Sequence, residues 1–192
     1  MKNIHCSQSK PRPNHSHSLD FINRELREMP QQTSHECLNK LPFKSRTHPT
    51  HGVYISPSKP TIVNASICCE NRKPWLATDK HHAILLDIWQ DASHWVVSRY
   101  VLMPDHLHLF AAPQATAVDF ESWVKYFKSQ FTKRNRDSSC EWQTGHWDTR
   151  IRDHEHYEEK SIYMFNNPVR AGLVKDASDW KYKGVVHELR WE

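Results

Sequence analysis

The amino-acid sequence predicts an α+β protein with a ferredoxin-like sandwich, in which helices cover one face of an antiparallel sheet. Three observations support this prediction. Segments with alternating or dense apolar residues, which are typical of strands, recur between residues 60 and 152. Two longer segments between them carry apolar residues at helical spacing. The resulting order is β-α-β-β-α-β followed by a third helix, and it is the order of a split βαβ sandwich.

The strands are predicted from their side-chain patterns. Apolar residues at every second position predict a first strand between residues 63 and 69. Dense apolar segments at 95–103 and 106–112 flank a Pro-Asp turn at 104–105, so these two strands are expected to form a β-hairpin. A short fourth strand is expected at 147–152.

The helices are predicted from apolar stripes and from residues that cap helix ends. Asp79 opens the first helix, and Asp119 can cap the second, which runs to about residue 135. The third is expected from about 154 to 166, where Pro168 should stop it. The buried stripes are expected to be Ile84, Leu85, Ile88, Trp89 and Ala92 in the first helix, and Phe120, Trp123, Val124, Phe127 and Phe131 in the second.

Two parts of the chain differ in composition. Residues 1–58 are rich in Pro, Ser, His and Asn, and we expect a largely flexible leader with one possible short helix around residues 19–29. Residues 59–192 are expected to form the folded domain. The net charge of +4 arises in the first 47 residues, which carry eight Lys and Arg against four Asp and Glu. The folded part is therefore neutral on balance.

Several classes of protein are excluded by composition. The sequence contains no apolar run of roughly 18 to 20 residues and no apolar core of a signal peptide near its start, so membrane and secreted proteins are excluded. Its five cysteines include no CxxC pair, which fits neither a disulfide framework nor a zinc ribbon. We expect reduced thiols in a cytoplasmic protein.

The pair His106 and His108 is the first candidate for chemistry. Alternate residues of a strand project to the same face, so both imidazoles can reach one metal ion while Leu107 points into the core. The pattern HxH occurs three times among 15 histidines, but only this pair lies in an otherwise apolar strand. Two hydrogen-bonded structural histidines are the alternative interpretation.

Tyr163 and Asn167 lie four residues apart near the end of the third helix, so they share one helix face. An Asn side-chain oxygen is a competent ligand for a hard metal ion, and a Tyr hydroxyl can act as a covalent nucleophile. The ordinary alternatives are a helix-terminating Asn before Pro and a Tyr that packs beside the core.

Three segments of the sequence resemble one protein family. They are residues 103–108 (Met-Pro-Asp-His-Leu-His), residues 142–153 (Trp-Gln-Thr-Gly-His-Trp-Asp-Thr-Arg-Ile-Arg-Asp) and residues 163–174 (Tyr-Met-Phe-Asn-Asn-Pro-Val-Arg-Ala-Gly-Leu-Val). Together they look like the REP-associated tyrosine transposases of the HUH (His-hydrophobic-His) single-strand DNA transposase superfamily. The resemblance covers about residues 50–187.

The resemblance implies an activity and a site. His106, His108 and Asn167 would hold a divalent metal, expected to be Mg²⁺ or Mn²⁺, and Tyr163 would attack the DNA backbone. The product would be a 5′-phosphotyrosine link and a free 3′ end, which allows single-stranded DNA beside a REP-like hairpin to be cleaved and rejoined. The resemblance also implies a bacterial cytoplasmic protein that joins the nucleoid when bound to DNA, as a monomer or homodimer.

The expected DNA surface combines local charge with this resemblance. Between residues 121 and 136 five basic residues face one acid, although a merely solvated helix face would look the same. An exposed Trp142 or Trp147 could stack on bases, if it is not part of the core. A hairpin-DNA-binding protein without cleavage activity and a metal hydrolase unrelated to DNA remain alternatives. The expected DNA-binding residues are Lys125, Lys128, Arg134, Arg150, Arg152 and Arg170.

Overall fold

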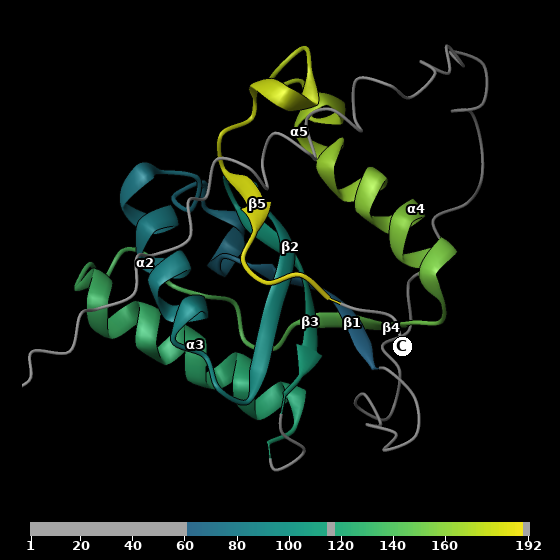
Figure 1. Cartoon of the computed structure of the whole chain (residues 1–192). Helices are drawn as coiled ribbons and strands as arrows, with labels where there is room; N and C mark the ends of the chain where they lie inside the picture. Colours follow the sequence, from purple (N-terminus) through teal and green to yellow (C-terminus); the bar gives the residue numbers. More distant parts are fainter. Residues whose placement is uncertain (1–60, 115–117, 190–192) are drawn as a thin grey trace, which may run out of the picture.

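A computed structural model of the chain describes residues 61–114 and 118–189. The predicted leader, residues 1–58, and its possible helix lie outside the described residues, as does the proposed domain boundary. The described part is built around one five-stranded antiparallel sheet with the order β4-β1-β3-β2-β5 (Figure 1). Its first four strands and two intervening helices follow the predicted β-α-β-β-α-β order, so the ferredoxin-like α+β fold is confirmed.

The strands form where the apolar patterns predicted them. The hairpin of β2 and β3 turns at Pro104 and Asp105, as expected, and Met103 N donates to His106 O across the turn at 2.8 Å. The sequence did not indicate a fifth strand, whose three residues pair with the outer edge of β2. The bounds are Ile62–Cys68 for β1, Trp95–Leu102 for β2, His106–Pro113 for β3, Trp147–Ile151 for β4 and Lys183–Val185 for β5.

Helices α2 (Asp79–Gln90) and α3 (Phe120–Asn135) pack on one face of the sheet. Thr78 caps α2 by accepting a hydrogen bond from His81 N at 3.2 Å, and Asp119 caps α3 by accepting one from Ser122 N at 2.7 Å. The predicted stripe of α3 is buried in full against the sheet. This face holds the larger hydrophobic core.

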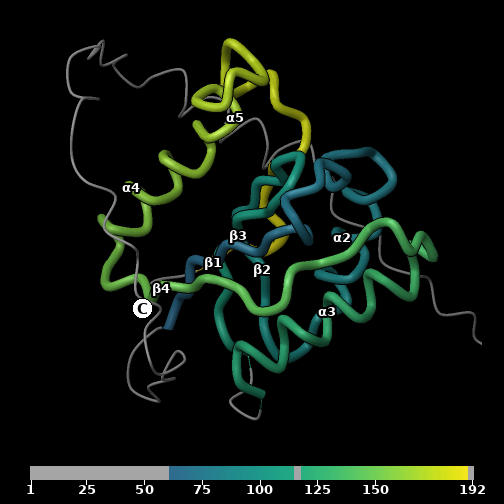
Figure 2. The backbone as a smooth tube through the Cα atoms, turned by 180° about the vertical axis from the view of Figure 1, so that it is seen from behind, coloured from purple at the N-terminus to yellow at the C-terminus, as the bar shows by residue number. Residues whose placement is uncertain are grey.

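Helix α4 (His154–Phe165) lies on the opposite face, so the sheet is covered on both sides and not on one alone (Figure 2). Its buried residues Tyr157, Met164 and Phe165 join a second core cluster with residues of the sheet. Pro168 does not end helical structure, because a one-turn helix, α5 (Asn167–Arg170), follows directly. Pro168 lies in the first turn of α5, where a missing N–H removes no helical hydrogen bond.

No helix in the described ranges has the length and apolar character needed to cross a bilayer.

Candidate active site

One row of residues crosses all five strands at the level of the histidine pair. In the antiparallel register Lys183 lies opposite Val101, Val101 opposite His108, His108 opposite Ser66, and Ser66 opposite Trp147. Directly opposite residues of antiparallel strands share a face of the sheet, so all five side chains project to one side. That side is the one covered by α4, because Val101 and Phe110, two residues beyond His108, belong to the α4 cluster.

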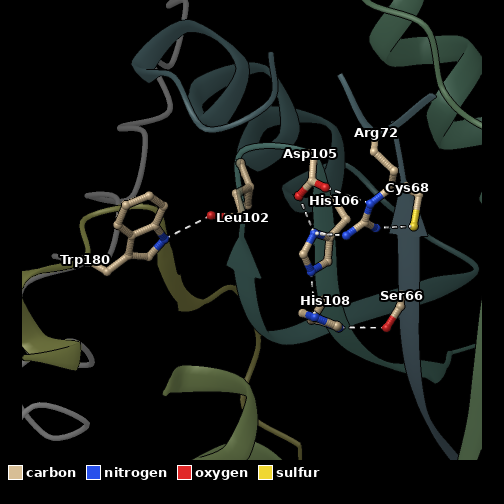
Figure 3. A network of polar contacts seen from close by, with 8 residues as sticks. All are labelled: Ser66, Cys68, Arg72, Leu102, Asp105, His106, His108 and Trp180. Atoms are coloured by element: carbon tan, nitrogen blue, oxygen red, sulfur yellow. Dashed lines mark hydrogen bonds and ion pairs between the residues drawn. The ribbon is translucent and has the colours of Figure 1, made fainter. Parts of the chain in front are cut away.

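The two imidazoles converge through one nitrogen each. His106 Nε2 lies 3.1 Å from His108 Nε2, with the rings nearly perpendicular (Figure 3). Their other ring nitrogens are held by neighbours: His106 Nδ1 lies 2.7 Å from Asp105 Oδ1, and His108 Nδ1 lies 2.7 Å from Ser66 Oγ. When both Nδ1 atoms carry the proton and donate to these oxygens, both Nε2 lone pairs point into the same space.

This arrangement fits a divalent cation. Two lone pairs 3.1 Å apart repel each other unless a proton or a cation lies between them. Adjacent ligands of an octahedral ion at metal-ligand distances of about 2.1 Å lie roughly 3 Å apart, close to the observed separation. A carboxylate or hydroxyl on the far nitrogen is also the usual second partner of a metal-binding histidine. The paired histidines are therefore suited to be two ligands of one ion.

Burial keeps both histidines neutral, as metal ligands must be. It lowers the pKa of His106, although the hydrogen bond to the Asp105 carboxylate partly offsets the effect. For His108, burial together with the neighbouring His106 lowers the pKa to about 3. Each ring therefore has a free lone pair at neutral pH, available to an ion and not blocked by a second proton.

Arg72 extends the polar network from the other side. Its Nε lies 2.7 Å from Asp105 Oδ2 and its Nη1 lies 2.9 Å from Cys68 Sγ (Figure 3). Its Nη2 approaches His106 Nδ1 to 3.3 Å, but both atoms are donors once Nδ1 donates to Asp105, so we assign the bond to the carboxylate. Arg72 and Asn71 both adopt left-handed backbone conformations, at φ 55° and 51°. Such strained residues are uncommon and cluster at functional sites.

A third ligand of such an ion would have to come from another part of the chain. Across residues 61–114 and 118–189, no group of three or more His, Cys, Asp and Glu is arranged to hold a metal. Asn167, which opens α5, is half-buried, and its side chain makes no hydrogen bond within these ranges. The Nδ2 atom of the neighbouring Asn166 donates to Ile162 O at 3.0 Å, whereas its Oδ1, the atom that could bind an ion, makes no hydrogen bond within the same ranges. The role of Asn167 as the third ligand stays a prediction.

Tyr163 lies on the outer side of α4 with 54% of its surface exposed. The guanidinium of Arg170 covers its ring, with Cζ 4.1 Å from the ring centroid. Within the described residues, the Tyr163 ring contacts Arg170. Neither His106 nor His108 contacts Tyr163 there. The juxtaposition of Tyr163 and the histidine pair therefore stays a prediction.

The course of α4 brings its C-terminal end to the level of the histidines. Near its start, the Tyr157 ring packs on Phe110 at 4.6 Å between centroids. At its end, Phe165 lies above Lys183, whose Nζ is 5.9 Å from the ring centroid, and Lys183 belongs to the same row as His108. The tyrosine helix and the histidine pair thus share one face and one end of the sheet.

Three of the basic residues predicted to bind DNA have partners within the chain, and they lie on α3, which covers the face opposite the histidines. Lys125 pairs with Glu121 at 2.7 Å, and Arg134 pairs with Asp87. Lys128 Nζ donates to the carbonyls of Gln143 and Gly145, at 2.8 and 2.6 Å. Burial lowers the pKa of Lys128 to about 8. The structure does not bring Lys125 and Arg134 together with the histidine pair, whereas Lys128 reaches the segment 143–145 beside Ser66 and Cys68.

The other basic residues that were predicted to bind DNA lie nearer to α4. Arg150 and Arg152 line an open groove of about 1020 Å³ between β4 and the first half of α4. The other charged or titratable residues of its lining are Lys160, His156 and the three acids Asp153, Glu155 and Glu159. Arg170 lies on Tyr163, as described. Of the two tryptophans considered for base stacking, Trp142 packs against the core, whereas Trp147 is 44% exposed.

The sequence did not point to three residues of the network. The alternating pattern of β1 indicates to which face of the sheet Ser66 projects, but it does not indicate that Ser66 pairs with His108. Asp105 lies in the predicted turn, and the turn gives no sign of its contact with His106. Arg72 lies 34 residues before His106, and its contact depends on the left-handed backbone of the short 3-10 helix Glu70–Arg72.

Searches for relatives agree with the fold. No family model matches the chain. A REP-associated tyrosine transposase of Escherichia coli (strain K12) is 31% identical over 117 residues, which cover 58% of this chain and 68% of that protein. A second relative of the same family name, from Haemophilus influenzae (strain ATCC 51907 / DSM 11121 / KW20 / Rd), is 28% identical over 104 residues. The match covers 47% of this chain and 59% of that relative, less than two thirds of its length.

A solved structure of a REP-associated tyrosine transposase bound to a REP hairpin has the same fold. It superposes with a TM-score of 0.61 and 24% identity over 71% of this chain and 82% of that one. The sheet order and the helices on its two faces thus define an α+β protein with the fold of that structure. The coverage of the Escherichia coli relative shows that the chain belongs to the REP-associated tyrosine transposases.

Proposed function

We propose that this protein is a metal-dependent, single-tyrosine transposase that cleaves and rejoins single-stranded DNA beside REP-like hairpins through a 5′-phosphotyrosine intermediate. The observation that carries this proposal is the convergence of His106 Nε2 and His108 Nε2, 3.1 Å apart, on the face covered by the helix of Tyr163. Membership of the family supports the same activity.

The histidine pair and Asn167 would hold Mg²⁺ or Mn²⁺. When bound, such an ion would offset the negative charge of the scissile phosphate and lower the barrier to attack on it. Asp105 and Ser66 fix the orientation of the two imidazoles, so these ligands are preorganised. Two imidazoles and one amide leave room for the phosphate and for water, as a catalytic site requires.

Tyr163 would supply the nucleophile. Its phenol oxygen forms a bond to phosphorus and loses its proton, while the bond from phosphorus to the 3′ oxygen breaks and that oxygen gains a proton. The DNA is left with a free 3′-hydroxyl and a 5′ phosphate esterified to the protein. The ester bond is exchanged and not hydrolysed, so a later attack by a 3′-hydroxyl can reseal the strand. Arg170, stacked on the ring, carries a positive charge beside the new phosphotyrosine.

The expected ligand is a folded DNA stem with a single-stranded flank, as in the hairpin bound by the structural neighbour. Arg150 and Arg152, in the groove beside β4, and Arg170, on the Tyr163 ring, would contact the DNA from the side of α4. Lys125, Lys128 and Arg134 would require DNA to reach the opposite face or the edge of the sheet. We further propose that the protein acts in the cytoplasm, on DNA of the nucleoid, as a monomer or homodimer.

A denaturation-resistant protein-DNA band tests the proposal. Labelled single-stranded DNA carrying a REP-type hairpin is incubated with protein and Mn²⁺ or with EDTA. We expect the wild type to form the band with Mn²⁺ only, and Tyr163→Phe and His106→Ala to form none. Tyr126→Phe is a matched control, because Tyr126 is 55% exposed on α3, away from the histidines.

Two outcomes would contradict the proposal. A band that persists in Tyr163→Phe would mean that another group is the nucleophile. Tight hairpin binding without a band in the wild type, under both Mg²⁺ and Mn²⁺, would favour a protein that binds hairpin DNA without cutting it.

A further inference from the structure

A small pocket opens beside the histidine pair, on the same face of the sheet. Its volume is about 260 Å³, and it is lined by Ser66 and Cys68 of β1 and by residues 143–147. Ser66 is also the partner of His108 Nδ1, so the pocket and the candidate metal centre share a wall. Pockets for drug-sized ligands span roughly 300 to 1,000 Å³. A pocket of this size suits a single ring system.

The register places the pocket at a defined distance from the histidines. Trp147 lies opposite Ser66, which lies opposite His108, so two strand spacings of about 4.8 Å separate Trp147 from His108. The separation of about 10 Å is one that an extended nucleic-acid strand crosses in one or two nucleotides. A phosphate held at the histidines would therefore leave a neighbouring base within reach of the pocket.

The rim of the pocket is braced from both sides. Gln143 N donates to Cys68 O at 2.9 Å, and Glu70 N donates to Glu141 O at 2.8 Å, so the segment is fastened to the end of β1. From α3, Lys128 Nζ binds the carbonyls of Gln143 and Gly145. Gly145 adopts φ +77°, a left-handed turn that residues with a side chain rarely adopt. The pocket is thus preformed and not created by a ligand.

The chemistry of the lining matches a nucleobase. Trp147 offers a large aromatic face that is 44% exposed, and bases stack on such faces whatever their sequence. Gln143 and Thr144 are exposed, and within the described ranges their side chains make no hydrogen bond. A primary amide and a hydroxyl can each donate and accept, which allows them to read the edge of a base.

We propose that this pocket binds one unpaired nucleobase next to the reactive phosphate, with Trp147 stacking on it and Gln143 and Thr144 selecting it. The inference rests on the proposed function, since it assumes that a DNA strand crosses the histidine face. It assigns to Lys128 a positioning role, in which the ammonium group holds the rim and need not touch DNA.

The affinity for single-stranded DNA tests whether the pocket binds a base, independently of DNA cleavage. The affinity for three fluorescein-labelled single-stranded 12-mers, of dA, dC or dT alone, is measured in EDTA. The parent protein carries Tyr163→Phe and cannot form an adduct. Trp147→Leu should weaken binding of all three oligonucleotides about tenfold, whereas Trp147→Phe should stay within about threefold of the parent. Tyr126→Leu, at a tyrosine that is 55% exposed on the opposite face, should change nothing.

Base selection is tested with the double variant Gln143→Ala and Thr144→Ala. The parent should distinguish the three oligonucleotides, and the double variant should bring their affinities within about a factor of two. Equal affinities in the parent, or equal losses in Trp147→Leu and Tyr126→Leu, would overturn the inference. A wild type without an adduct would instead contradict the proposed function and leave these affinities to decide on the pocket.

Discussion

Arg72 Nε lies 2.7 Å from Asp105 Oδ2, and the other oxygen of this carboxylate lies 2.7 Å from His106 Nδ1. A guanidinium therefore fixes the carboxylate that in turn fixes an imidazole. The strained left-handed backbone of Asn71 and Arg72 is the local cost of this contact. The orientation of His106 consequently depends on a residue 34 positions earlier in the chain.

Asp105→Ala should weaken Mn²⁺ binding by about 10- to 100-fold, because loss of a second partner lets the imidazole rotate and favours the other tautomer. Isothermal titration with Mn²⁺ measures the change. Asp87→Ala is the control, since Asp87 pairs with Arg134 on the opposite face. Unchanged affinity in a folded Asp105→Ala protein would show that His106 needs no orienting partner.

Arg170→Ala should slow formation of the covalent adduct about tenfold and leave Mn²⁺ binding unchanged. It removes the cation stacked on the Tyr163 ring, and about 1.4 kcal/mol corresponds to a factor of ten. Arg170→Lys, which keeps the charge but not the planar group, should lie between. Single-turnover rates measure this. Lys181→Ala is the control, because Lys181 covers the Tyr182 ring at 5.0 Å, and equal slowing in both variants would refute a specific role.

Phe110→Ala should lower the free energy of unfolding by about 3–5 kcal/mol, because Phe110 is fully buried against Tyr157 of α4. Urea denaturation measures the loss. The milder Phe110→Leu should also speed amide exchange in α4, whereas Phe131→Leu, in the other core cluster, should speed exchange in α3. Equally faster exchange in both helices in either variant would mean that the two clusters are not separate.

The buried Lys128 should make the free energy of unfolding rise with pH between about 8 and 10.5. In the folded protein its pKa is lowered to about 8, while in the unfolded chain it keeps the ordinary value of 10.5. Between these values the unfolded chain holds a proton that the folded one has released, so this contribution to stability grows as pH increases. The unfolding free energy of the wild type minus that of Lys128→Met should therefore increase from pH 8 to 10.5. Urea denaturation across this range would contradict the idea if the difference stayed constant.

Much of the fold could be predicted because local patterns determine it. Alternation in β1 and the cap Asp119 depend on neighbouring residues, and the two-residue period of β3 correctly put both histidines on one face. Which face of the sheet α4 covers could not be predicted in this way. Its amphipathic pattern identifies the buried side of the helix, but the connection after β4 decides on which side of the sheet the helix lies.

The site could be predicted only where its candidate residues lie close together in the sequence. His106 and His108 are two positions apart, and Tyr163 and Asn167 are four apart. The residues that pair with these side chains come from distant strands and helices, so the sequence did not indicate them. Ser66 pairs with His108, and Asp87 pairs with Arg134. Charge counts along α3 therefore overstated the free positive charge, since folding pairs Lys125 and Arg134 with acids.

The row Ser66, Trp147, His108, Val101 and Lys183 draws one residue from every strand of the sheet. Its members span 118 positions, from 66 to 183, so the face that they form has no precursor in any local segment. A nascent chain emerging from the ribosome carries both histidines long before β5 has been synthesised. The complete row can therefore exist only after the last strand has been synthesised and has paired with β2.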